Sequence, residues 1–180
     1  KLACEFIGAV FADAWRINTP SFALIKIMPE HWASISLSHS SSAPAAGFRK
    51  IEGVIDITPT SFRQVEVNTE TLYQLLKIAL FDFWIANEDR TYNNANLLYD
   101  IEKARLISID YGGILNNVTF DFPLLQLTET DSILGADIFA HIVKFVSSKQ
   151  LTEAVERLKK DYTQCINRSK QKSSLLTEMP

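Results

Sequence analysis

The sequence is poor in cysteine and glycine, and each shortage excludes a kind of site. The two cysteines, Cys4 and Cys165, are far apart and have no metal-ligating neighbours, so we expect reduced thiols rather than a disulfide or a zinc site. The six glycines form neither a G-x-G-x-x-G nor a G-x-x-x-x-G-K-S/T pattern, so neither glycine-rich phosphate loop is present. No run of about 18 apolar residues occurs, so we predict no membrane span and a cytoplasmic location.

An excess of positive charge is also missing. The 18 lysines and arginines stand against 21 aspartates and glutamates, and the net charge of −3 argues against a generic nucleic-acid-binding surface. Hydrophobic residues make up 47% and charged residues 22%, which is the composition of an ordinary globular protein. A chain of 180 residues can bury a sizeable core, so we expect one domain, or one lobe of a larger protein.

The spacing of apolar residues predicts an α+β fold that is mainly helical. Helices are expected over residues 2–14, 67–86, 132–146 and 150–167, and short strands over 21–28 and 53–57. Either Asn68 or Thr69 can cap the helix at 67–86. The serine-rich stretch 33–47 is expected to be a flexible loop, with serine phosphorylation as the less favoured alternative. The polar tail from Ser169 is expected to fray.

The stretch 87–113 carries the residues best suited to chemistry. Asp89 is followed five positions later by Asn94, which is the D-x4-N spacing of a kinase catalytic loop. Two apolar segments within 95–109 predict a β-hairpin that returns the chain, so that Asp110 lies near Asn94. The run Asp110-Tyr111-Gly112 resembles D-F-G, with Tyr in place of Phe. Phosphoryl transfer needs oxygen ligands for Mg²⁺ and a carboxylate beside the attacking hydroxyl, so this pattern favours a phosphotransferase.

Three other interpretations of this stretch fit the sequence less well. Polar residues after a helix can simply bond their own backbone, but the long helix, the hairpin and the D-Y-G run together favour a site. A calcium loop would need Asp or Asn at Thr91, Gly at Asn94 and Glu at position 100. A nucleophilic triad finds no G-x-S-x-G pattern, and none of the three histidines has a serine or cysteine partner at a suitable spacing.

With these residues in place, the sequence resembles the HipA-like kinases, bacterial serine/threonine kinases known from toxin–antitoxin systems. The resemblance is strongest over Leu72–Leu115, where FDFWIANEDRTYNNANLLYD is similar to the family's helix and its N-x-D-R-H-x-x-N-x-x-L-L segment. A weaker resemblance covers the opening CEFIGAVFADAWRINTP, which is similar to the family's N-E-Y helix and the strand after it. The resemblance implies a protein-kinase-like C-lobe with a short hairpin that carries the catalytic and metal residues, and a reduced N-lobe.

The resemblance also implies a role for each matching residue in the catalytic stretch. Asp89 would be the catalytic base that faces the substrate hydroxyl. Asn94 and Asp110 would be Mg²⁺ ligands, with Asp110 bridging the ATP phosphates. Asn87 and Arg90 would brace the catalytic loop.

Nucleotide-binding residues follow from the same resemblance. Glu5 is similar in position to the family's Glu in the first helix and would pair with a lysine that contacts the ATP phosphates. Ile55, Asp56 and Ile57 would lie near the hinge that holds adenine. The implied cofactors are ATP and Mg²⁺.

Two departures from the family bear on activity. Thr91 stands where the family usually has His, so a hydrogen bond that braces the loop is lost or replaced. The family's phosphate loop and ATP-contacting lysine should precede the first helix, which here begins at residue 2. We therefore expect residues 1–66 to be the remnant of an N-lobe with its linker, 67–168 to be a helical C-lobe, and 169–180 to be a flexible tail.

The expected function is ATP- and Mg²⁺-dependent phosphoryl transfer to a serine or threonine hydroxyl of a protein. Two alternatives stay open. One is a kinase-like pseudoenzyme or binding module that acts through a protein partner. The other is a small-molecule phosphotransferase of the aminoglycoside-kinase type, which usually has His two residues before the base, where this chain has Asn87. Expected partners are a protein substrate and an antitoxin protein; neither direct nucleic-acid binding nor membrane association is expected.

Overall fold

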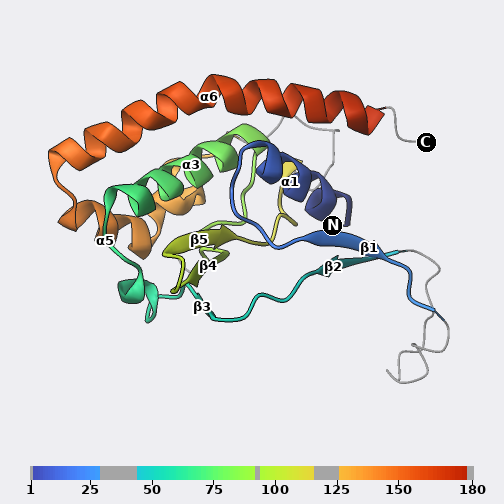
Figure 1. Cartoon of the computed structure of the whole chain (residues 1–180), viewed down its shortest axis with the longest axis horizontal. Helices are drawn as coiled ribbons and strands as arrows, with labels where there is room; N and C mark the ends of the chain where they lie inside the picture. Colours follow the sequence, from blue (N-terminus) through green and yellow to red (C-terminus); the bar gives the residue numbers. More distant parts are fainter. Residues whose placement is uncertain (1, 29–43, 92–93, 116–125, 178–180) are drawn as a thin grey trace.

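The computed structural model describes residues 2–28, 44–91, 94–115 and 126–177 (Figure 1). Within these residues the protein is α+β and mainly helical, as predicted. The helices are α1 (Leu2–Ala14), α3 (Thr69–Ile85), α5 (Asp137–Phe145) and α6 (Ser148–Thr177). The strands are β1 (Phe22–Ile25), β2 (Ala45–Phe48), β3 (Val54–Asp56), β4 (Leu97–Asp100) and β5 (Arg105–Ser108). None of these helices is long and apolar enough to cross a membrane.

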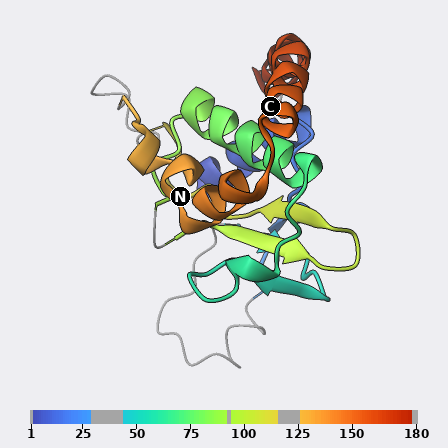
Figure 2. The same ribbon diagram turned by 90° about the vertical axis from the view of Figure 1, so that its left-hand side faces the viewer.

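The elements are stacked in layers. Helix α6 lies over α3 and α1, and the antiparallel sheet β3-β4-β5 lies on the other side of α3 (Figures 1 and 2). Strands β1 and β2 form a separate antiparallel ribbon. Aromatic rings attach this ribbon to α1. The ring centroid of Phe22 lies 5.6 Å from that of Phe6 in α1 and 5.2 Å from that of Phe48 in β2.

Helix α3 runs through the centre of the fold and leads into the catalytic stretch. Asn68, one of the two predicted caps, accepts a hydrogen bond from the Thr71 N–H at 2.8 Å. The helix ends at Ile85. Ala86, which follows, has a left-handed backbone (φ 51°) that turns the chain, and its N–H donates to the Asp82 carbonyl. Burial of an apolar side chain contributes about 1.5–3 kcal/mol, and the fully buried residues of α3 include Leu72, Leu75 and Phe81.

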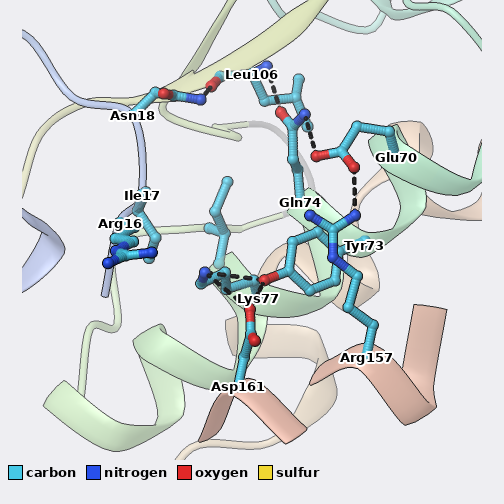
Figure 3. A pocket seen from close by; sticks show the side chains of 11 residues that line it. Arg16, Ile17, Asn18, Glu70, Tyr73, Gln74, Lys77, Leu106, Arg157 and Asp161 are labelled. Atoms are coloured by element: carbon cyan, nitrogen blue, oxygen red, sulfur yellow. Dashed lines mark hydrogen bonds and ion pairs between the residues drawn. The ribbon is translucent and has the colours of Figure 1, made fainter. Parts of the chain in front are cut away.

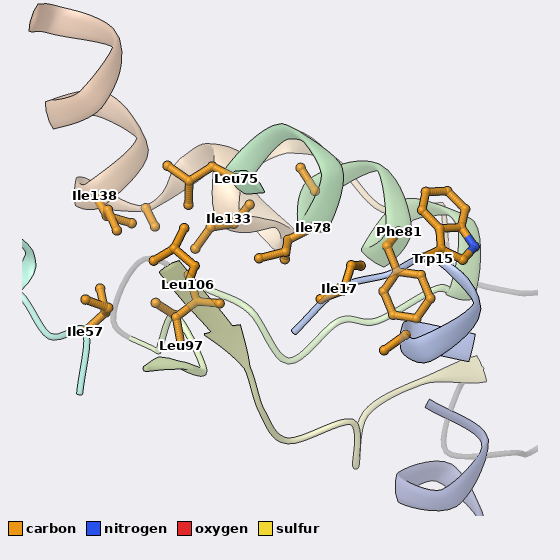
Figure 4. Packing of buried hydrophobic residues seen from close by; sticks show 14 of the residues in the cluster. Trp15, Ile17, Ile57, Leu75, Ile78, Phe81, Leu97, Leu106, Ile133 and Ile138 are labelled. Carbon is orange, nitrogen blue, oxygen red and sulfur yellow. The ribbon is translucent and has the colours of Figure 1, made fainter. Parts of the chain in front are cut away.

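Trp15, directly after α1, joins the three long helices. Its fully buried ring has centroid distances of 5.4 Å to Phe81, 5.5 Å to Trp84 and 6.0 Å to Tyr162. The core continues between α3, the sheet, α5 and the segment before α5 (Figure 4). Its aliphatic members there include Ile57, Ile78, Leu97, Leu106, Ile133 and Ile138.

The β4–β5 hairpin forms as predicted. Asp100 closes its turn, since Oδ1 accepts a hydrogen bond from the Lys103 N–H at 3.1 Å and Oδ2 accepts one from Arg105 Nε at 3.3 Å. At the other end the Ile109 N–H donates to the Asn96 carbonyl at 3.0 Å. The hairpin therefore brings the end of β5 back to the residues that precede β4.

Helix α6 is longer than predicted. The helix expected to end near Asn167 continues to Thr177, and Ser169, expected in a fraying tail, is buried. The Ser169 hydroxyl accepts a hydrogen bond from Trp15 Nε1 at 3.1 Å and donates one to the Cys165 carbonyl at 3.0 Å. Tertiary contacts thus hold a polar segment in the helix.

Two other boundaries differ from the predictions. Two short 3₁₀ turns, Glu129–Asp131 and Ile133–Gly135, precede α5, and the second of them occupies the start of the predicted helix 132–146. Helix α5 starts only at Asp137, because Ala136 has an extended backbone with ψ 150°. The last residues of the predicted loop 33–47 belong to β2, which pairs with β1. The serines of that loop, considered above as phosphorylation sites, lie outside the described residues.

Candidate active site

A buried ion pair joins the last turn of α3 to the loop that follows it. The side chains of Asp82 and Arg90 are both 0% exposed, and Arg90 Nε lies 2.9 Å from Asp82 Oδ2. Asn87 Nδ2 donates to Asp82 Oδ1 at 2.9 Å. Burial raises the pKa of the Asp82 carboxyl, while the Arg90 charge and the Asn87 hydrogen bond oppose the shift. The pair fixes the loop to the helix, because separating these two charges would leave each of them buried and unpaired.

The other nitrogens of the Arg90 guanidinium bind the hairpin. Nη1 donates to the Ala95 carbonyl at 2.9 Å and to the Asn96 carbonyl at 2.6 Å. Nη2 donates to Ser108 Oγ and to the Ile109 carbonyl, the latter at 3.3 Å. One side chain therefore ties the end of α3 to the residues before β4 and to the end of β5.

Asp89 is held through its backbone, and its side chain is half-buried. Its N–H donates to Asn87 Oδ1 at 3.4 Å, and its carbonyl accepts hydrogen bonds from Asn96 Nδ2 at 3.2 Å and Asn94 Nδ2 at 3.5 Å. The carboxyl lies beside Gly113, where an added Cβ would be 2.9 Å from Asp89 Cβ and 3.4 Å from Oδ2. The glycine therefore allows the segment after the D-Y-G turn to pack closely against Asp89.

Asn94 lies on an exposed turn that the backbone closes. The Thr91 N–H donates to the Asn94 carbonyl at 3.0 Å, and the Asn94 N–H donates to the Thr91 carbonyl at 3.1 Å. This pair of bonds braces the loop at the position where a histidine is usual in the family that the sequence resembles. The side-chain amide of Asn94 faces the Asp89 carbonyl.

The D-Y-G turn brings two carboxylates to one place. Asp110 has a left-handed backbone (φ 57°), and its Oδ1 accepts a hydrogen bond from the Gly112 N–H at 3.1 Å. Glu5 Oε2, from α1, accepts one from the Tyr111 N–H at 3.1 Å. A Cβ added to Gly112 would lie 3.1 Å from Asp110 Oδ1 and 3.5 Å from Glu5 Oε1. Both oxygens therefore face the same small space beside Gly112.

This space favours a cation. Burial raises the pKa of Glu5; the Tyr111 amide opposes that shift, and the negative charges of Asp110 and Asp89 add to it. A divalent cation would relieve the repulsion, and carboxylate oxygens are ligands that suit Mg²⁺. In the described part of the chain no three Asp, Glu, His or Cys side chains form a complete metal site. The residues nevertheless fit Mg²⁺, because that ion usually keeps several waters and phosphate oxygens as ligands.

Tyr111 anchors the D-Y-G turn in the core. Its hydroxyl donates to Ser108 Oγ at 2.7 Å, and its ring centroid lies 5.7 Å from Arg90 Cζ. Burial raises the pKa of Tyr111 to about 12, so its hydroxyl stays protonated and can donate. Helix α1 packs against this ring at Gly8. The Tyr111 ring therefore packs the D-Y-G turn against α1, the helix that supplies Glu5.

The residues expected near adenine lie on β3 and directly after it, at the edge of the sheet. The Ile57 N–H donates to the Leu97 carbonyl at 2.9 Å, and the Ile57 side chain is buried in the core. Ile55 is partly buried, and the exposed Asp56 accepts a hydrogen bond from Ser61 through its carbonyl. These three residues bind β4 and the turn after β3, and they are not grouped with the acidic residues around Gly112.

Several residues that hold the site were missed by sequence reasoning. Asp82 did carry a signal, since it is the one charged residue in the apolar run 78–85. Gly8 carried another, because a glycine inside a helix costs about 1 kcal/mol relative to alanine and often marks a close contact. No local pattern distinguishes the remaining three, which are Asn96, Ser108 and Gly113.

An α+β scaffold that presents an aspartate in a D-x4-N loop, an aspartate in a D-Y-G turn and a glutamate from the first helix defines a kinase-like protein. The chain belongs to the HipA-like kinase family, whose model matches residues 1–172. The comparisons with curated proteins and with solved structures give no match. The family indicates a kinase-type phosphotransferase, a class that in general uses a nucleotide and a divalent metal ion.

Proposed function

We propose that the protein transfers a phosphoryl group from ATP, with Mg²⁺, to a serine or threonine hydroxyl of a protein. The observation that supports this proposal is the grouping of Asp89, Asp110 and Glu5 around the adjacent glycines Gly112 and Gly113. The buried ion pair behind the loop keeps that grouping in place. On family grounds, the proposed partners are a protein substrate and an antitoxin protein.

Asp89 is the proposed base. Its carboxyl packs closely against Gly113 and its side chain is only half-buried, so part of it stays accessible to a substrate hydroxyl. A hydroxyl within hydrogen-bond distance would give its proton to Asp89 as its oxygen bonds to the phosphorus, and the bond between that phosphorus and the leaving phosphate would break. Asn87 and Asn96 fix the backbone of this residue, so the carboxyl is positioned before substrate arrives.

Asp110, Asn94 and Glu5 are the proposed metal-side residues. When bound, Mg²⁺ would neutralise part of the negative charge on the ATP phosphates. Asp110 and Glu5 offer carboxylate oxygens beside Gly112, and Asn94 offers an amide oxygen from the exposed turn. In the described part of the chain Glu5 forms no ion pair with a lysine or arginine; it binds the Tyr111 amide, which orients the D-Y-G turn.

The test is phosphate transfer from labelled ATP to casein as a generic acceptor, with and without Mg²⁺. Asp89→Asn should reduce kcat by at least about a hundredfold, because it removes a group that acts on the proton in the transition state. Glu102→Gln, in the exposed turn of the hairpin, makes the same acid-to-amide change away from the site and should leave the rate unchanged. Undiminished transfer by Asp89→Asn would show that Asp89 is not the base.

A kinase-like binding module is the second candidate. It is favoured by the engagement of Glu5 with the Tyr111 amide and by the incomplete metal site in the described residues. Calorimetric titration with ATP in the presence and absence of Mg²⁺ separates the two functions. Binding that requires Mg²⁺ and is lost in Asp110→Asn supports the kinase, whereas the absence of binding by the folded chain supports the module.

A further inference from the structure

A polar cavity lies beside the N-terminal half of α3, away from the catalytic loop. Its volume is about 280 Å³, and its walls come from the turn after α1, from α3, from β5 and from α6 (Figure 3). Lys77 lies about 13 Å along the axis of α3 from the end of the helix where the catalytic loop begins. The cavity is slightly below the usual size range for drug-sized ligands, so it suits a small molecule.

The ammonium group of Lys77 is nearly buried in the cavity wall and is only partly satisfied. The side chain is 7% exposed, and an ammonium has three N–H donors. In the described residues Lys77 Nζ donates to the Tyr73 hydroxyl at 2.9 Å and lies 3.7 Å from Asp161 Oδ2, which is beyond hydrogen-bond distance. The Tyr73 hydroxyl in turn donates to Asp161, so the carboxylate is shared (Figure 3). Lys77 therefore keeps donor capacity for a further acceptor.

Arg16 adds a second cationic group at the edge of the same cavity. It is exposed, and its guanidinium has no hydrogen-bond or ion-pair partner among the residues that the structure describes. Its backbone is left-handed (φ 55°), a conformation that usually favours glycine where a helix ends. The Arg16 N–H donates to the Asp13 carbonyl and the Ile17 N–H donates to the Ala12 carbonyl, both at 2.9 Å, so this turn ends α1 and places Arg16 at the edge of the cavity.

The other charged groups of the wall are already paired. Arg157 forms an ion pair with Glu70, and its Cζ lies 3.7 Å from the ring centroid of Tyr73 (Figure 3). The lining thus has three cations, Arg16, Lys77 and Arg157, against two carboxylates, Glu70 and Asp161. Arg157 pairs with Glu70 and Lys77 pairs with Asp161, so the surplus positive charge is that of Arg16, while Lys77 still has donor capacity.

We propose that this cavity binds a small molecule through a carboxylate or phosphate group, which accepts hydrogen bonds from Lys77 and Arg16. Burial lowers the pKa of Lys77, so a bound anion would also stabilise the charged form of that lysine. Both anions offer several oxygen acceptors, and hydrogen bonds to charged donors are the strong ones in proteins. The inference stands independently of the proposed kinase activity, because none of the residues around Gly112 lines the cavity.

The test is calorimetric titration of the protein with inorganic phosphate and, separately, with succinate. Loss of one charged hydrogen bond costs about 1.5–3 kcal/mol, so Arg16→Gln and Lys77→Met should each weaken binding by about tenfold or more. Arg49→Gln is the matched control, since Arg49 is also exposed and lies outside the cavity. Binding of phosphate alone or succinate alone would support the proposal and assign the anion class.

Two results would overturn the proposal: no binding of either probe, or equal binding by Arg16→Gln and Arg49→Gln. Lys77→Met leaves Asp161 without its buried partner, so its circular dichroism must be compared with that of the unmodified chain. If that variant fails to fold, the comparison of Arg16→Gln with Arg49→Gln decides the question, because both arginines are exposed.

Discussion

Gly8 and Tyr111 are in direct contact, since a Cβ added to Gly8 would lie 2.3 Å from Tyr111 Cβ and 2.5 Å from its Cγ. No side chain larger than that of glycine fits at these distances, so α1 can approach the D-Y-G turn only with glycine here. Glu5 lies three residues before Gly8 and therefore near it on the helix surface. The contact thus also determines where the Glu5 carboxylate lies.

Gly8→Ala should destabilise the fold. An alanine inside a helix is normally more stable than glycine by about 1 kcal/mol. Here the added methyl overlaps Tyr111, and overpacking of this kind costs about 1–3 kcal/mol. Urea denaturation should therefore give a lower free energy of unfolding for the variant. A net stabilisation would show that α1 and the turn can separate without cost.

Gly113→Ala should impair catalysis more than stability. The added Cβ would lie 2.9 Å from Asp89 Cβ, so the carboxylate must move. Displacement of a reacting group by about 1 Å can cost up to about a hundredfold in rate, and we expect kcat to fall by about tenfold to a hundredfold. Rates of phosphate transfer and urea midpoints should be measured on the same preparation. An unchanged kcat would show that phosphate transfer does not depend on the position of the Asp89 carboxylate.

Removing Arg90 should cost much more than removing an exposed cation. Arg90→Met leaves Asp82 buried and unpaired, which is expected to cost about 3–5 kcal/mol. Lys50→Met breaks the exposed Lys50–Glu52 pair and should cost less than about 1 kcal/mol. In a double-mutant cycle, adding Asp82→Asn to Arg90→Met should cost less than Asp82→Asn alone. Simple additivity would mean that the two buried groups do not interact.

Glu5 should make stability depend on pH. Its pKa is raised above the ordinary value of 4.5, mainly by burial, with a further increase from Asp110 and Asp89. Its protonated form therefore favours folding, and this contribution is present below pH 4.5 and is lost as the pH rises through the pKa of the folded state. Glu5→Gln should thus be more stable than the unmodified chain at neutral pH, and the difference should disappear in acid. Thermal unfolding without divalent cations checks this, and a less stable variant at neutral pH would contradict it.

Ser169→Ala should destabilise the contact between α6 and α1. The change leaves the buried Trp15 indole N–H without its acceptor, which is expected to cost about 1–3 kcal/mol. Ser173→Ala, on the exposed surface of the same helix, is the matched control and should have little effect. Both free energies of unfolding can be taken from urea curves followed by tryptophan fluorescence. Equal values would mean that the end of α6 does not contribute to the fold.

Features with local causes could be predicted from the sequence. The Asn68 cap and the apolar spacing after it define α3, and the polar turn at Asp100 defines the hairpin. The approach of Asp110 to the residues before β4 follows from that hairpin. In each case the cause lies within a few residues of its effect, which is the range over which propensity and periodicity are informative.

Features caused by distant residues could not be predicted. The end of α6 has a polar sequence, and contacts with distant residues, such as those of Ser169 with Trp15 and of Lys172 with Asp13, hold it against α1. The role of Gly8 depends on Tyr111, more than a hundred positions away in the chain. Asp82 is one charge in the apolar run 78–85, and its partner Arg90 lies eight positions further along the chain, beyond the helix. Tertiary packing decided each of these positions.

The bonds of Arg90 have a consequence for when activity can appear. This side chain holds α3 through Asp82 and the hairpin through Ser108, and the proposed base is its immediate neighbour in the chain. A molecule in which the hairpin has detached from the helix has no fixed position for Asp89. The fold and the proposed catalytic geometry therefore depend on the same side chain. Under the proposed function, a chain that has not closed this contact would have no positioned base and would not transfer phosphate.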